Sequence, residues 1–307
     1  MIKMEQKSVT ALVSTFSRAY HAENNEVKIF DDSMARLFLS EEEYGQISKN
    51  MAEGIGFFNP SFKGTPDEAL RWVVDNQLSP SPLGRAAFTE KALYAAVSSG
   101  ARQYLILGAG YDSFAYRQPA WAKEIQIFEI DHPATAKDKR AKLEKAKLTI
   151  PDNVQYITAD FMKQEWQTAL TQNIKFNKNQ ISFCSILGVV YYLSVQTFVD
   201  LISGLSALLP VGSSIVFDYP DENTYTDKGG ERAKKQAMLA ATANEKMLAG
   251  YSYEDMENVL SSHGFLIYEH LTPGEVTGQY FEAYNHANPL HPMTAFDNVN
   301  YCLAVRK

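Results

Sequence analysis

The sequence is poor in cysteine and has no long uninterrupted hydrophobic run. Its 307 residues include two cysteines, Cys184 and Cys302, and both lie in apolar segments. Such thiols fit a reduced interior better than a disulfide framework or a metal cluster. The most apolar stretch, residues 181–195, is broken by serines and a glycine, and it is shorter than the ~18 residues that a membrane-spanning helix needs. The first residues carry no apolar core of a secretory signal. We therefore expect a cytoplasmic protein with no membrane partner and no metal.

The sequence also lacks an excess of positive charge. Its 29 basic and 36 acidic residues give a formal net charge of −7, whereas a nucleic-acid-binding surface is usually basic. With 45% hydrophobic and 12% aromatic residues, the composition is that of a folded globular protein and excludes a disordered or collagen-like chain. We expect no nucleic acid as a partner, and the oligomeric state cannot be derived from these features.

The order of apolar runs and turn residues predicts an α/β protein. Residues 1–95 show helical spacing interrupted by turns at residues 59–60, 64–66 and 79–82, and a helix is expected over residues 86–98. Strands then alternate with helices, which is typical of a parallel sheet covered on both faces. Strands are expected at residues 103–107, 125–130, 154–158, 180–186, 213–218, 265–270 and 300–305.

The predicted fold is a doubly wound, seven-stranded, mostly parallel sheet. Residues 1–95 form an N-terminal helical cap or lid, and residues 96–307 form the core, with insertions at about 219–250 and 271–298. In such sheets ligands bind beyond the carboxyl ends of the strands. If the last strand is antiparallel, the segment 271–299 begins and ends at this edge, and we expect its aromatic residues to lie over the site.

Two features after the first two strands favour a nucleoside-binding site. The first strand ends in Gly108-Ala109-Gly110, where glycines permit a tight turn and close approach to a ligand. The second strand ends in Asp131, roughly 20 residues later, the spacing of an acid that binds a ribose diol. Each feature also has a purely structural interpretation, as a strand-to-helix turn and as a helix cap.

The charges near this loop favour S-adenosylmethionine over a dinucleotide. Ser113 occupies the place of the third glycine of a dinucleotide motif, and Asp112 lies beside it. A carboxylate there would repel a pyrophosphate but attract a sulfonium and an ammonium group. Asp160 and Phe161 follow the third strand and suit adenine, by a hydrogen bond to its amino group and by ring packing. Asp160 could instead cap the next helix.

Four segments resemble the ordered motifs of the leucine carboxyl methyltransferase family. They are GAGYDSFAYR (108–117), IFEIDHP (127–133), ITADF (157–161) and ILGVVYYLS (186–194). The family contains class I S-adenosylmethionine-dependent methyltransferases, with a Rossmann-like fold, including bacterial O-methyltransferases of secondary metabolism. The resemblance covers residues 82–218.

The resemblance implies a set of cofactor-binding residues. It implies that Arg85 contacts the cofactor carboxylate, that Gly108 and its loop line the methionine part, that Asp131 binds the ribose, and that Asp160 and Phe161 bind the adenine. His132 follows the ribose acid, and we expect it to face either the cofactor or solvent. Asp112 lies in the same loop as Gly108. Leu187 stands where several members have a glutamate, so the polar contact to the amino-acid end of the cofactor is either absent or supplied by Asp112 or a backbone carbonyl.

The sequence names no convincing general base. Tyr192, His286 and His291 are weak candidates, and a carboxylate acceptor needs no base. We therefore expect methylation of a carboxylate or acidic hydroxyl of a small molecule. The alternatives are a protein C-terminal carboxyl methyltransferase, an NAD-dependent oxidoreductase on a similar sheet, and a non-catalytic cofactor-binding protein.

Overall fold

The centre of the molecule is the predicted doubly wound sheet. The computed structural model describes residues 8–160, 165–242 and 245–307. Its seven strands follow the order β3-β2-β1-β4-β5-β7-β6, with β7 antiparallel to both of its neighbours. The strands are β1 (Gln103–Leu107), β2 (Gln126–Asp131), β3 (Val154–Thr158), β4 (Ser182–Ile186), β5 (Ser214–Pro220), β6 (Phe265–Leu271) and β7 (Val299–Arg306). This confirms the predicted fold class and the place of every predicted strand to within two residues.

Burial on both faces of the sheet explains why its central strands could be predicted from apolar runs in the sequence. Every residue of β1, β4 and β5 is buried, so each strand is a nearly continuous apolar run, as expected in parallel sheets. One face of the sheet packs against three helices, with Trp166, Phe198 and Met256 in that apolar cluster. The other face packs against a long helix and the late segment, represented by Leu83, Phe88 and Phe281 in a second cluster.

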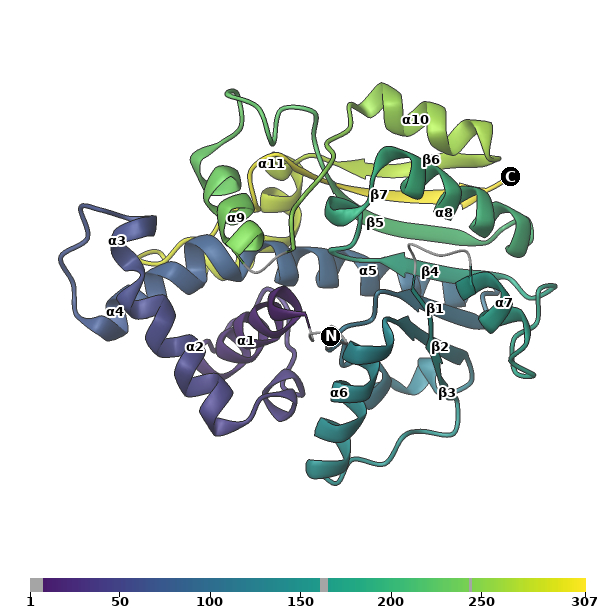
Figure 1. Cartoon of the computed structure of the whole chain (residues 1–307), viewed down its shortest axis with the longest axis horizontal. Coiled ribbons are helices and arrows are strands. Elements are labelled where there is room, and N and C mark those ends of the chain that lie inside the picture. The colour runs from purple at the N-terminus through teal and green to yellow at the C-terminus, as the bar shows by residue number, and fades with distance from the viewer. Residues whose placement is uncertain (1–7, 161–164, 243–244) are drawn as a thin grey trace, which may run out of the picture.

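The helices form two layers and a separate group at one end of the sheet. Figure 1 shows the N-terminal helices and α9 beyond the same end of the strands, while α8 and α10 lie along the sheet. The N-terminal helices are α1 (Val9–Asn24), α2 (Glu41–Glu53), α3 (Ile55–Phe58) and α4 (Pro66–Val73), followed by α5 (Pro80–Ser98). The later helices are α6 (Pro133–Lys145), α7 (Glu165–Thr171), α8 (Val195–Leu208), α9 (Glu231–Thr242), α10 (Tyr253–Ser262), α11 (Pro273–Val276) and α12 (Glu282–Ala287).

The start of α5 differs from the prediction. The sequence predicts a turn at residues 79–82 and a helix from residue 86, but the helix already begins at Pro80. Proline is tolerated in the first helical turn because its missing N–H would have no partner there. A π-helical turn, η2 (Val74–Leu78), connects α4 to α5. The predicted domain boundary at residue 95 therefore falls inside α5.

Capping residues mark the ends of two helices that cover the sheet. Ser194 and Ser252 cap α8 and α10 by accepting hydrogen bonds from backbone N–H groups, and Gly264 follows α10 with a φ of 74°. The insertion expected at about 219–250 contains α9, which spans Glu231–Thr242. Among the described residues, no helix is long and apolar enough to cross a membrane.

Candidate active site

The glycine loop after β1 requires its glycines for two physical reasons. Gly108 and Gly110 have φ values of 71° and 52°, which L side chains rarely adopt. A Cβ on Gly108 would also lie 2.4 Å from Cγ2 of Val189. The Gly108 N–H donates to the carbonyl of Ile130 at 2.8 Å, which ties the loop to β2. The loop is thus held close against two neighbouring strand ends.

Asp131, the last residue of β2, binds this loop directly. Its Oδ2 accepts a hydrogen bond from the N–H of Gly110 at 2.6 Å, and its Oδ1 accepts one from the N–H of His132 at 2.7 Å. Burial raises the pKa of Asp131, although both backbone N–H groups favour the ionised form. Nδ1 of His132 accepts from the N–H of Ala134 at 3.4 Å, so this histidine caps α6. The cap role therefore belongs to His132, and the Asp131 carboxylate reaches across to the glycine loop.

The remainder of the loop is anchored to the N-terminal segment. Ser113 Oγ donates to Oδ1 of the fully buried Asp32 at 2.5 Å. Asp32 also pairs with Arg18 and, at 3.5 Å, with Arg117. Burial alone would raise the pKa of Asp32, but the two guanidinium groups and the Ser113 hydroxyl hold it below its usual range. Asp32 and Arg18 were not found by sequence reasoning, because no local pattern links them to a loop about eighty residues away.

Asp112 keeps its place in this loop by a short-range contact. Its Oδ1 accepts a hydrogen bond from the N–H of Phe114 at 2.8 Å. Arg117, at the end of the same motif, donates from Nε to Ser113 Oγ at 2.8 Å and forms an ion pair with Glu90 of α5. Ser113 and Arg117 therefore hold the loop between the N-terminal segment and α5.

A second polar cluster forms at the ends of β4 and β5. Asp218, fully buried in β5, accepts hydrogen bonds from the Gly188 N–H at 2.7 Å and from the Tyr191 hydroxyl at 2.8 Å. Its Oδ2 also lies 3.2 Å from Nη1 of Arg85. Gly188 has a φ of 67°, and a Cβ there would lie 2.4 Å from the same nitrogen of Arg85. Arg85 is thereby fixed next to Leu187. The sequence analysis named Asp218 only as a strand end.

Both clusters open into one cavity of about 1150 Å³. The described candidates for cofactor binding all line it: Arg85, Gly108, Ala109, Gly110, Asp112, Asp131, His132, Asp160 and Leu187. Phe161 lies outside the described residues. The N-terminal helices and residues 236–242 and 245–247 supply much of the remaining wall, including Val13, Met51, Phe58, Gln77, Gln236, Leu239 and Met247. The structure therefore brings the predicted residues together from α5 and the ends of four strands.

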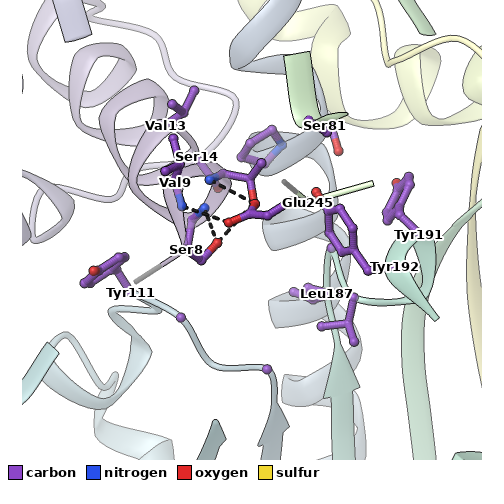
Figure 2. Close-up of a pocket in the computed structure, with 18 of the residues that line it drawn as sticks. Ser8, Val9, Val13, Ser14, Ser81, Tyr111, Leu187, Tyr191, Tyr192 and Glu245 are labelled. Atoms are coloured by element: carbon purple, nitrogen blue, oxygen red, sulfur yellow. Dashed lines mark hydrogen bonds between the residues drawn. The ribbon is translucent and has the colours of Figure 1, made fainter. Parts of the chain in front are cut away.

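Tyr192 lines the same cavity, opposite the N-terminus of α1 (Figure 2). Burial raises the pKa of Tyr192. Between the two elements lies Glu245, whose carboxylate accepts from the N–H groups of Val9 at 2.9 Å and Thr10 at 3.3 Å. The N–H of Leu248 donates to the carbonyl of Tyr191 at 2.8 Å. The end of the insertion 219–250 is thus attached to both sides of the cavity.

The late segment does not lie over the cavity, and this prediction was wrong. The structure describes all of residues 272–298, and none of them lines the cavity. Phe281 and Tyr284 are instead buried in the core, and the Tyr284 hydroxyl accepts a hydrogen bond from Arg71 at 3.0 Å. With these rings turned inward, His286 faces solvent, 81% exposed and 4.0 Å from Glu282. His291 is also exposed. Neither histidine is near the predicted chemistry.

The residues that line the cavity fit S-adenosylmethionine. Asp112, Asp131 and Asp160 offer acceptors for an ammonium group, ribose hydroxyls and an amino group of adenine. Arg85 offers a cation for a carboxylate, and the glycine loop leaves room for close backbone approach. A pyrophosphate would meet these acidic groups with unfavourable charge. Within the described parts of the chain, no three acidic, histidine or cysteine side chains gather into a group that could hold a metal ion.

Comparisons with known proteins agree with this site. The family model of leucine carboxyl methyltransferase matches residues 11–206. A Bacillus subtilis (strain 168) protein, YktD, named provisionally as an S-adenosyl-L-methionine-dependent methyltransferase, is 40% identical over the full length of both chains. A Mycobacterium marinum protein with the same kind of name is 27% identical over 71% of this chain and 67% of its own length.

Two solved structures share the fold. A DUF574 family protein from Streptomyces avermitilis superposes over the whole of both chains with a TM-score of 0.60 and 12% identity. A protein from Thermobifida fusca, described provisionally as a methyltransferase, covers 99% of this chain and 97% of its own with a TM-score of 0.54 and 12% identity. The predicted enzyme class and cofactor, a methyltransferase that uses S-adenosylmethionine, are confirmed by the family match and the relatives. The chain belongs to the leucine carboxyl methyltransferase family.

Proposed function

We propose that this methyltransferase acts on the oxygen of a small molecule, at a carboxylate or an acidic hydroxyl. The observation that carries the proposal is the cavity, whose volume of about 1150 Å³ exceeds the ~300–1,000 Å³ of typical small-molecule sites. It therefore has room for a cofactor and an acceptor together. Its wall away from the strand ends is largely apolar, with Val13, Met51, Phe58 and Leu239. A buried apolar wall of this kind suits a small, partly apolar acceptor.

We also propose how the cofactor lies in the cavity, and the positions of the lining residues support this assignment. We assign the methionine carboxylate to Arg85, the methionine chain to the glycine loop with Asp112 and Leu187, and the ribose to Asp131 beside His132. The adenine is assigned to Asp160, and Phe161 remains a prediction. S-adenosylmethionine, when bound, supplies a methyl group already activated by the sulfonium. The protein residues here bind and orient; none of them needs to form a covalent bond.

The acceptor oxygen has to ionise without help from a strong base. Tyr192, the nearest of the predicted candidates to the cofactor loop, has a raised pKa and stays protonated at neutral pH. Glu245 is occupied by the N–H groups of α1. A carboxylate or an acidic hydroxyl is already anionic, so orientation and exclusion of water suffice for transfer. We propose that α1 and residues 236–242 and 245–247 supply this enclosure.

Two measurements test the proposal. Calorimetry should show binding of S-adenosylmethionine and S-adenosylhomocysteine and none of NAD. The enzyme is then incubated with deuteromethyl S-adenosylmethionine and a panel of aliphatic acids, aromatic acids, phenols and a peptide ending in leucine, with products detected by mass spectrometry. Methyl esters are cleaved by mild alkali and methyl ethers are not, so this treatment separates carboxylate from hydroxyl acceptors. Labelling of the peptide alone would refute a small-molecule acceptor.

We also propose that the protein acts in the cytoplasm and does not methylate nucleic acid. Both cysteines are buried free thiols, which suits the reducing cytoplasm. The acidic net charge of −7 remains the reason to expect no nucleic acid as the acceptor. A filter-binding experiment with duplex DNA and transfer RNA at low salt tests the second expectation.

A further inference from the structure

Two buried glutamines of this chain differ in their hydrogen bonding. Gln103, at the start of β1, is 1% exposed, and its amide donates to the carbonyl of Asn177 and to Ser182 Oγ, each at 2.9 Å, and accepts from the Asn177 N–H at 2.8 Å. Gln77 is 6% exposed, and no described residue hydrogen-bonds to its amide. Neither polar atom of this amide is among the fully buried ones that lack a partner, so the amide is open to the cavity that Gln77 lines and can bind a ligand there.

The backbone around Gln77 is irregular. Gln77 lies in the π-turn η2, where the N–H of Ser79 donates to the carbonyl of Val74 at 2.9 Å, one residue farther than in an α-helix. π-Helical turns are rare in proteins, and those that occur are often found at functional sites. Four residues later, in the first turn of α5, Ser81 is also 6% exposed, and its hydroxyl has no partner among the described residues. Gln77 and Ser81 both line the cavity, and Figure 2 shows Ser81 at its wall.

The surroundings of this pair are apolar or already neutralised. Neighbouring parts of the cavity wall include Phe30, Met51, Phe58, Leu78 and Leu239. The arginines that line the cavity each pair with an acid: Arg18 with Asp32, Arg85 with Asp218, and Arg117 with Glu90. The pair itself offers neutral donors and acceptors.

We propose that Gln77, together with Ser81, binds an uncharged polar group of the methyl acceptor, a carbonyl, hydroxyl or amide carried on an apolar frame. This group is distinct from the oxygen that receives the methyl. The inference rests on the proposed function, because it concerns the acceptor. A ligand with the polar group hydrogen-bonds the Gln77 amide, whereas an analogue without that group covers the amide and leaves it without a partner. Gln77 is thus a residue that determines acceptor specificity.

The test compares Gln77→Met and Gln77→Leu with Gln103→Met as the matched control. The acceptors are matched pairs of acids that differ in one polar group: phenylbutyric and benzoylpropionic acids, and decanoic acid and its hydroxylated analogue. In the unmodified enzyme, kcat/KM should favour the polar member of at least one pair by about tenfold or more. Both Gln77 variants should lose this preference, while Gln103→Met keeps it.

Stability and cofactor binding separate this role from a structural one. Gln77→Met should leave the Tm unchanged or raise it, because the side chain has no partner to lose, whereas Gln103→Met should lower the Tm. Affinity for S-adenosylhomocysteine, measured by calorimetry, should be unchanged in both Gln77 variants. A preference that survives in Gln77→Met, a lowered Tm, or weakened cofactor binding would each overturn the inference. If the unmodified enzyme methylates no member of the panel, the proposed function itself fails, and the inference fails with it.

Discussion

Replacing Asp131 by asparagine tests the centre of the cofactor site. The two carboxylate oxygens accept from two different backbone N–H groups, those of Gly110 at 2.6 Å and His132 at 2.7 Å. An asparagine has one oxygen, so its NH₂ group must face one of these N–H donors. The variant therefore loses at least one hydrogen bond to a charged acceptor, worth ~1.5–3 kcal/mol. It also loses the charged acceptor that we assign to the ribose hydroxyls.

The expected result is a large loss of cofactor affinity in a folded protein. A hydrogen bond from a ribose hydroxyl to a charged acceptor is worth ~1.5–3 kcal/mol, so its loss corresponds to roughly 10- to 150-fold weaker binding of S-adenosylhomocysteine. The assay is calorimetry at a temperature where circular dichroism shows both proteins folded. Asp200→Asn, on the exposed surface of α8, is the control and should bind like the parent. If Asp131→Asn binds within about threefold of the parent, Asp131 only fixes the loop, and the ribose lies elsewhere.

Three further predictions concern groups around the site. Gly188→Ala should displace the guanidinium of Arg85, because its Cβ would lie 2.4 Å from Nη1. Calorimetry should then show at least about tenfold weaker binding of S-adenosylhomocysteine. The control Gly45→Ala, with open space around its Cβ, should bind the cofactor like the parent. Asp32→Asn should lower the free energy of unfolding by ~3–5 kcal/mol, since it removes the buried carboxylate that pairs with Arg18 and Arg117. The control Asp31→Asn, at an exposed carboxylate, should leave the denaturation midpoint unchanged. Burial lowers the pKa of His21 from 6.5 to about 4. Between these pH values the histidine is protonated in the unfolded chain and neutral in the folded protein. The free energy of unfolding should therefore fall as the pH drops from 6.5 towards 4, and His21→Gln should show a smaller fall in urea titrations over that window.

The parts of the site that were predicted correctly depend on short stretches of sequence. Gly108 and Asp131 each follow directly from the end of a buried strand, and a strand end fixes where the next side chain lies. Once the strand order is known, these ends meet at one edge of the sheet. A pattern of a few residues is therefore enough to bring such groups into one cavity, and the cavity contains every described residue that was assigned to the cofactor.

The parts that were missed depend on contacts between distant segments. Asp32 reaches Ser113, and Asp218 reaches Arg85 across 133 residues. Neither acid has a neighbour in sequence that signals this role. Gln77 is similar, because its exposure to the cavity comes from a π-turn that composition does not reveal. Such groups can be assigned only when the packing of α1, η2 and α5 is known.

The error about residues 271–298 has a physical explanation in α5. The predicted topology was correct, since β6 ends at the same edge as the other parallel strands and β7 returns antiparallel. However, the connecting segment buries Phe281 and Tyr284, and Phe281 packs against α5 at Gly84. A Cβ on Gly84 would lie 2.6 Å from the hydroxyl of Tyr301 and 3.2 Å from the Phe281 ring. Burial of a large aromatic side chain contributes ~1.5–3 kcal/mol, which favours packing into the core over covering a polar loop.

The walls of the cavity come from parts of the chain with different relationships to the family. The family model matches residues 11–206 and so includes the ends of β1, β2, β3 and β4 that we assign to the cofactor. It ends before Gln236, Leu239, Glu245 and Met247, which line the cavity. These later residues, with Gln77 and Met51 from the N-terminal helices, face the space that we assign to the acceptor. Under the proposed assignment, cofactor binding and acceptor selection use different walls, so relatives could share the cofactor site and differ in the acceptor site. The acceptor of this enzyme should therefore be sought from the side chains of its own cavity, and the family name supplies the reaction but not the substrate.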